Sequence, residues 1–138
     1  NKVLKESSLI LSKNTFFKYK NYNTSFEIIT IYLIIYIKKN IYFKNENYKL
    51  INDELISIFI RDLDDSLRNI GIGDMSIGKY VKSYVKKFYF RIKIFPDYND
   101  FFSKISLTEY LKKINIIKNN EFSQASNVII SSLKDLIN

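Results

Sequence analysis

One stretch of the chain, residues 62–91, holds the side chains whose types and spacing could do chemistry. It contains all three glycines, Gly71, Gly73 and Gly78, with carboxylates before them and lysines after them. The chain has no histidine and no cysteine. Zinc, haem and serine–histidine–aspartate sites depend on those two residue types, so these sites are excluded, and so are disulfides. No run of aspartates with ligand spacing indicates a magnesium or calcium site.

Asp62 breaks the pattern of its segment. On a helical wheel it lies between Ile51 and Leu55, inside the apolar face. Burying an unpaired carboxylate is costly, so we expect Asp62 to be buried and hydrogen-bonded as a structural contact. A catalytic carboxylate is the alternative, but no second acid or base accompanies Asp62 at a recognisable spacing.

The sequence Gly71-Ile72-Gly73-Asp74 precedes a helical pattern, which raises the question of phosphate binding at a helix start. The glycines lack both the dinucleotide spacing and a Gly-Lys-Ser/Thr ending, and Asp74 would repel a phosphate. We therefore expect a tight corner between two helices. Gly71 would end the first helix in a left-handed conformation, and Asp74 or Ser76 would cap the second.

Lysines follow the glycines at helical spacing and form one stripe: Lys79, Lys82, Lys86 and Lys93, flanked by Lys87 and Arg91. Residues 76–93 contain no acidic side chain. The stripe is either a solvated face or a docking surface for RNA, a ribosome or anionic lipid. Phe90 projects among the lysines, which favours docking. The net charge of +8 is weaker evidence for docking, because a composition rich in Lys, Ile and Asn is typical of AT-rich genes.

Helices must position these residues. We expect helices at residues 2–11, 26–39 and 50–70, and another from the glycine corner to Pro96. Residues 26–39 suit a strand by propensity, but their unbroken hydrophobicity and their neighbours favour a buried helix capped by Ser25. Two further amphipathic segments are expected to be helices. The first would bury Leu107, Tyr110, Leu111 and Ile114. The second would bury Phe122, Ala125, Ile129, Leu133 and Leu136. The sequence therefore predicts an all-α bundle of five to six helices, folded as one domain over residues 1–138.

A family resemblance rests on the same stretch. Its motifs are Asp62-Leu63-Asp64, Leu67-Arg68, Gly71-Ile72-Gly73-Asp74, Ile77, Lys79, Val81-Lys82 and Phe88-Tyr89. They resemble the signature of the ubiquinol–cytochrome c chaperone family, over about residues 26–91. Three positions depart from the family pattern: Asn69 replaces a glutamate, Phe90 a glycine and Tyr32 a histidine.

The resemblance implies a non-enzymatic, all-α assembly factor without a cofactor. Its partners would be newly made cytochrome b or other subunits of the cytochrome bc complex, a small partner protein, and a ribosome or an anionic membrane surface, but no DNA. It would act in the cytoplasm at the inner face of a bacterial inner membrane, or in the mitochondrial matrix of a eukaryote. The chain opens at Asn1 rather than at a methionine, so we expect residues upstream. The short chain without a visible presequence favours a bacterium.

Two sets of site residues follow. The expected partner-binding residues are Asp64, Arg68, Lys79, Lys82, Lys86, Tyr89, Phe90 and Arg91. The expected structural residues are Asp62, Leu67, Gly71, Gly73, Asp74 and Phe88. An apolar groove beside the helix at residues 26–37 would shelter a cytochrome b segment. The alternative function is a basic RNA- or ribosome-binding helical module.

Overall fold

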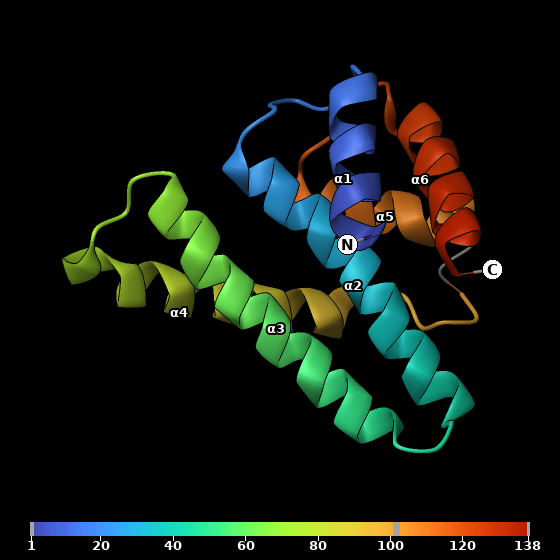
Figure 1. The fold of residues 1–138 in the computed structure, drawn as a ribbon. Helices are drawn as coiled ribbons and strands as arrows, with labels where there is room; N and C mark the ends of the chain where they lie inside the picture. Colours follow the sequence, from blue (N-terminus) through green and yellow to red (C-terminus); the bar gives the residue numbers. More distant parts are fainter. Residues whose placement is uncertain (1, 101–102, 138) are drawn as a thin grey trace. The chain divides into compact units, whose positions relative to one another are not determined.

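The computed structural model describes residues 2–100 and 103–137, and these residues form six helices and no strand (Figure 1). The helices are α1 (Lys2–Lys13), α2 (Tyr22–Phe43), α3 (Tyr48–Asn69), α4 (Asp74–Ile94), α5 (Lys104–Ile114) and α6 (Phe122–Ile137). The predicted all-α fold of five to six helices is confirmed.

The chain divides into two compact units. Unit 1 comprises residues 1–39 and 95–138, and unit 2 comprises residues 40–94. Unit 1 therefore contains α1, most of α2, α5 and α6, whereas unit 2 contains the end of α2 with α3 and α4. The expectation that residues 1–138 fold as one domain stays a prediction.

The apolar segment at residues 26–39 is helical, and the helix is longer than predicted. It begins at Tyr22, because the Asn21 side chain accepts hydrogen bonds from the backbone amide and the hydroxyl of Thr24, at 3.0 and 3.1 Å. Asn21 is thus the N-cap, and the expectation that Ser25 caps this helix is wrong. The helix runs on to Phe43 rather than ending at Lys39.

Unit 1 holds most of the core. Ile34 and Ile35 of α2 are completely buried, as a helix that is apolar on all sides requires. Pairing α5 with α6 buries the predicted faces of both helices, although Phe122 stays half-exposed. The segments before α2 and after α5 meet at an isolated antiparallel bridge between Phe17 and Ile117.

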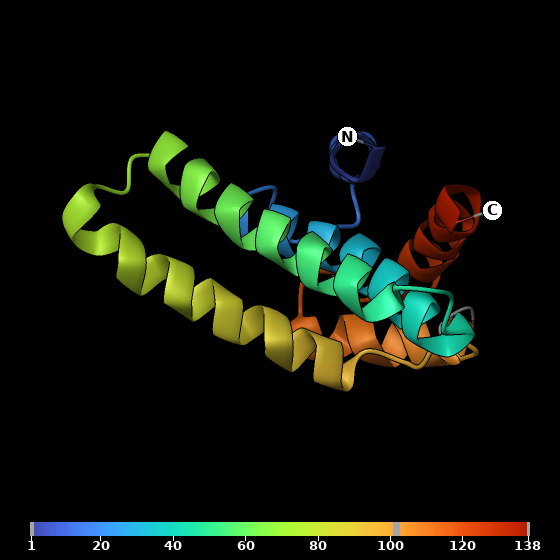
Figure 2. The ribbon, with the colours of Figure 1, turned by 60° about the horizontal axis from the view of Figure 1, so that its bottom comes forward.

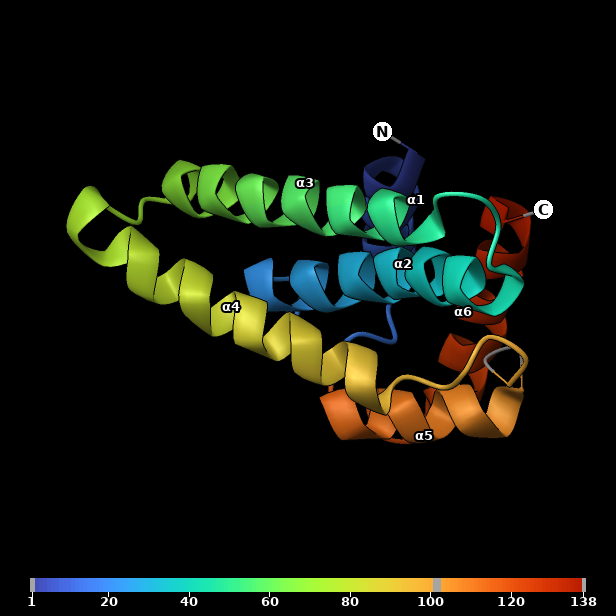
Figure 3. The same ribbon diagram turned by 90° about the horizontal axis from the view of Figure 1, so that it is seen from below.

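Unit 2 is built on two helices, α3 and α4, that run antiparallel from the glycine corner (Figure 2) and diverge toward their far ends (Figure 3). The rings of Phe59 and Phe88 meet with centroids 4.7 Å apart. The apolar residues of this unit that are buried are Leu63, Leu67, Ile77 and Phe88. The buried side of α3 therefore overlaps only part of the apolar face that the helical wheel indicated: Leu63 on that face is buried, whereas Ile51 and Ile70 are exposed.

The glycine corner ends α3 as predicted. Gly71 has φ +105°, a conformation that favours glycine. Its amide donates to the Arg68 carbonyl at 3.0 Å, and the Ile72 amide donates to the Leu67 carbonyl at 3.1 Å. These two bonds form a Schellman motif, which satisfies carbonyls that the last turn of α3 would otherwise leave unpaired.

Two glycine-to-alanine changes are expected to have opposite effects. Gly71→Ala should lower the free energy of unfolding by about 1 kcal/mol, because an L residue is strained at positive φ. Gly78→Ala should raise it by roughly 0.5–1 kcal/mol, since Gly78 lies inside α4 and an added Cβ meets nothing within 4 Å. Urea unfolding of both variants measures the difference. Equal effects would contradict a left-handed cap at Gly71.

Candidate functional site

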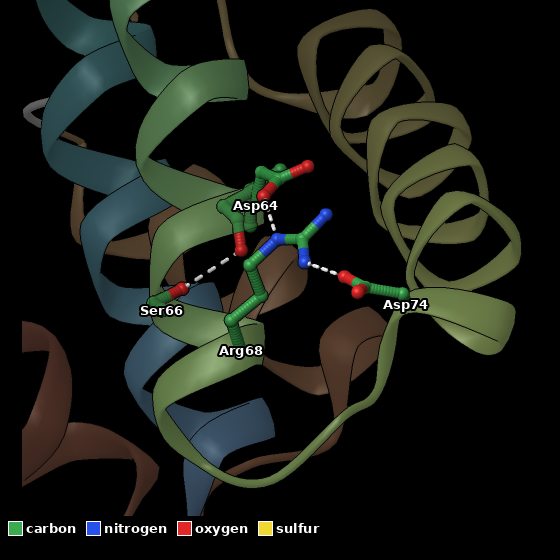
Figure 4. Close-up of polar contacts among 5 residues, drawn as sticks. Asp64, Ser66, Arg68 and Asp74 are labelled. Atoms are coloured by element: carbon green, nitrogen blue, oxygen red, sulfur yellow. Dashed lines mark hydrogen bonds and ion pairs between the residues drawn. The ribbon is translucent and has the colours of Figure 1, made fainter.

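Arg68 joins the end of α3 to the start of α4 across the glycine corner (Figure 4). Its Nε donates to Asp64 at 2.6 Å, and its Nη1 pairs with Asp74. The hydrogen bond that Arg68 donates to Asp64, followed by the one that it donates to Asp74, raises the pKa of Arg68 above its usual value. Exposed ion pairs of this kind add little stability, so the cluster mainly fixes the geometry of the corner. Asp64 and Arg68 were expected to bind a partner, and in this structure they bind each other.

Asp62 does not lie where the helical wheel placed it. Its side chain is exposed, because the buried side of α3 is centred on Leu63 and Leu67 and a neighbouring residue points about 100° away. The expectation of a buried, hydrogen-bonded Asp62 is wrong.

The start of α4 also differs in detail from the prediction. The Gly73 carbonyl accepts hydrogen bonds from the amides of Ser76 and Ile77, both at 3.0 Å. Gly73 therefore precedes the helix, and Asp74 is its first residue. Neither Asp74 nor Ser76 occupies the capping position. The Asp74 carboxylate lies at this helix start and is paired with Arg68, which leaves an unfavourable setting for phosphate.

The remaining expected structural residues are buried in unit 2. Leu67 is 1% exposed and Phe88 is fully buried. The Phe88 ring contacts Phe59 of α3, so it contributes to the packing of the α3–α4 pair.

The lysines of α4 are exposed. Lys79, Lys82, Lys86 and Lys93 all face solvent, and Tyr89 and Phe90 are about half exposed beside them, at 50% and 54%. Arg91 is partly covered, with its guanidinium carbon 5.8 Å from the centroid of the Phe90 ring. Met75, at the start of α4, is completely exposed.

Exposed apolar side chains are concentrated in unit 2. Among the described residues, ten of the thirteen large hydrophobic side chains that are exposed lie there, although this unit contributes only four of the 26 buried hydrophobic residues. Five of the ten form what we call the α2–α3 patch, on either side of the turn between these helices: Ile41, Tyr42, Phe43, Leu50 and Ile51. A hydrogen bond of 2.8 Å from Asn40 to Asn52 holds the two helix ends together.

The sequence did not reveal this patch, because we expected the second helix to end at Lys39. We expected the client groove beside residues 26–37 instead. Those residues are buried at almost every position, since α2 runs through the core of unit 1. A client-binding apolar face on that part of α2 is therefore ruled out.

No metal site emerges from the described residues, in which no three or more carboxylates gather closely enough to hold an ion. Within the same residues, none of the helices is sufficiently long and apolar to cross a bilayer.

A model of the ubiquinol–cytochrome c chaperone family matches residues 16–135. The chain belongs to this family. The match extends well beyond the resemblance at residues 26–91 and takes in α5 and most of α6. A ubiquinol–cytochrome c chaperone acts in the assembly of the respiratory complex of that name, which implies a non-enzymatic role and contact with a component of that complex. Searches of the curated proteins and of the solved structures found no match.

Proposed function

We propose that this chain is an assembly chaperone that binds newly made cytochrome b before it enters the ubiquinol–cytochrome c reductase complex. Family membership carries the proposal. It gives the protein a role in assembly, and the exposed apolar side chains of unit 2 supply a surface on which an apolar client segment can be held. The protein would work in the cytoplasm, at the inner face of a bacterial inner membrane.

The α2–α3 patch is the proposed client contact. Leu50 is 67% exposed, Phe43 50% and Ile41 47%. Exposed apolar side chains that gather at a surface typically mark an interaction site; here all five lie close to one turn, and the ring centroids of Tyr42 and Phe43 are 5.1 Å apart. Cytochrome b is a membrane protein, so its unassembled spans are apolar and need cover. The patch matches that chemistry, whereas the buried part of α2 offers nothing to bind.

The lysines of α4 would have a separate role. Lys79, Lys82 and Lys86, with the partly covered Arg91, are proposed to dock the chaperone on a ribosome, a membrane surface or a partner subunit while the α2–α3 patch holds the client. Tyr89 and Phe90 lie beside them and extend this surface. A small partner protein would bind a surface that neither the client nor the docking partner covers.

The double variant Ile41→Ser/Leu50→Ser is expected to weaken capture of a cytochrome b transmembrane peptide by about tenfold or more, because each side chain loses apolar area buried in the complex. In the organism that makes this protein, the same variant should fail to restore assembled ubiquinol–cytochrome c reductase to a deletion strain. Peptide affinity and the amount of assembled complex are the two measurements.

Ile105→Ser is the matched control. Ile105 is 74% exposed on α5 of unit 1, outside the patch, so its loss should leave both measurements unchanged. Normal assembly of the complex in the deletion strain would overturn the proposed function.

The alternative is a basic RNA-binding module that uses the same lysines. Phosphate contacts release counterions, so RNA binding should fall steeply as salt rises. Client capture that survives moderate salt and requires Ile41 and Leu50 favours the chaperone. Binding to RNA alone, abolished by salt, favours the alternative.

A further inference from the structure

One face of α4 combines exposed positive charge with exposed apolar side chains. At 100° per residue, the four lysines Lys79, Lys82, Lys86 and Lys93 fall on one narrow arc of the helix. Met75, Tyr89 and Phe90 fall on the same arc, within about 100° in all. All seven side chains are exposed. We call this face the α4 stripe.

Within α4 itself, no acidic side chain compensates the charge of the α4 stripe. Residues 76–93 contain no acidic side chain, and the carboxylate at the start of the helix, Asp74, is paired with Arg68. Each lysine close to an anionic lipid surface strengthens binding by about fivefold at physiological salt. Four lysines on one helix face thus suit a partner with a dense, flat array of negative charge.

The apolar members of the stripe indicate which anionic partner fits. Met75 is completely exposed at the start of α4, and Ile70 is 57% exposed at the end of α3, so aliphatic side chains project where the two helices turn. Tyr89 and Phe90 are half exposed near the other end of the stripe. Aliphatic and aromatic groups enter the boundary between headgroups and acyl chains, tyrosine favours that boundary, and lysines reach from it to the phosphates.

We propose that the α4 stripe docks this protein on the surface of an anionic phospholipid bilayer, with α4 lying along the headgroups. The proposal rests on the docking role proposed above for the lysines, and it names a lipid surface as their partner. RNA suits the surface less well. Sequence-tolerant RNA sites rely on rings that stack bases, whereas the exposed aliphatic side chains Met75 and Ile70 have no ring and suit the boundary of acyl chains and headgroups instead.

The test uses the purified chain and vesicles, with no client present. Sedimentation should show binding to vesicles of mixed phosphatidylglycerol and phosphatidylcholine and none to phosphatidylcholine alone. The variant Lys79→Gln/Lys82→Gln/Lys86→Gln is expected to lose affinity by about a hundredfold. Met75→Ser/Phe90→Ser should also weaken binding, and the remaining binding should be more sensitive to salt, since only charge then holds the protein to the surface.

A charge-matched variant provides the control. Lys49→Gln/Lys113→Gln/Lys118→Gln removes the same charge at exposed lysines outside the stripe and should bind the anionic vesicles almost as well as the parent. Far-ultraviolet circular dichroism confirms that each variant is folded. Equal loss in the stripe and control variants would overturn the proposal, because it would mean that net charge alone drives binding. Tighter binding to a single-stranded RNA than to anionic vesicles, unchanged by Met75→Ser/Phe90→Ser, would overturn it as well.

This outcome is separable from that of the proposed function. A protein that binds vesicles but leaves ubiquinol–cytochrome c reductase assembly unaffected when deleted would keep the membrane site and lose the chaperone role. A protein that supports assembly but does not bind anionic vesicles would keep the chaperone role and lose the membrane site.

Discussion

Phe88→Ala is expected to lower the free energy of unfolding of unit 2 by about 3–5 kcal/mol. The Phe88 ring is fully buried and stacks obliquely on Phe59, with centroids 4.7 Å apart. Only three other apolar residues of unit 2, Leu63, Leu67 and Ile77, are buried. Removing the largest member of so small a core leaves a cavity that the others are too few to fill.

Hydrogen exchange with mass spectrometry measures this effect by region. We expect amides of α3 and α4 to lose protection in Phe88→Ala, while amides of α5 and α6 keep theirs, because the cores of those helices belong to unit 1. Phe90→Ala is the control: it removes the same side chain two residues away, where the ring is 54% exposed, and should leave protection almost unchanged. Similar losses in the two variants would contradict the burial of Phe88.

Alkaline pH should destabilise unit 1 through Tyr32. Burial raises the pKa of this phenol from 10.0 to about 12; a hydrogen bond from or to Ser132 at 2.5 Å opposes the rise, and the Glu6 carboxylate adds to it. The unfolded chain ionises at pH 10 and the folded protein only near 12, so the stabilising effect of Tyr32 is complete below pH 10. It is lost as the pH rises to 12, by about 2 kcal/mol.

Urea unfolding of the parent and of Tyr32→Phe at several pH values checks this expectation. The parent should lose stability more steeply than Tyr32→Phe between pH 10 and 12, since phenylalanine has no proton to release. Tyr36→Phe is the comparison. Tyr36 also has a raised pKa through burial, but it is only half-buried and donates to the Leu136 carbonyl at 3.2 Å, so its removal should change the slope less. Parallel slopes for the parent and Tyr32→Phe would show that Tyr32 is not buried in solution.

The parts of the fold that the sequence predicted correctly depend on local backbone chemistry. Gly71 marks the end of α3 because few other residues adopt its positive φ, and that requirement is visible in one residue type. The apolar spacing of α5 and α6 identified their buried faces, because each of these short helices has one clear stripe. The family motifs include the glycine corner, so they too were visible in residue type and short-range spacing.

Asp62 shows where the same reasoning fails. The helix α3 carries apolar residues around much of its circumference, so its pattern allows more than one buried face. Tertiary packing buries the face that contains Leu63 and Leu67 and leaves Ile51 and Asp62 in solvent. A helical wheel describes one helix and contains no information about the neighbour that covers it.

The sequence by itself determined the all-α class, the glycine corner, the family and a lysine stripe without acidic neighbours, since each is encoded in residue type and short-range spacing. Only the tertiary structure decided which apolar residues are covered. It buried residues 26–37 in the core of unit 1 and left the α2–α3 patch and Met75 exposed in unit 2. The physical reason is that burial depends on contacts between segments distant along the chain, and hydrophobic sequence alone does not state which segments meet.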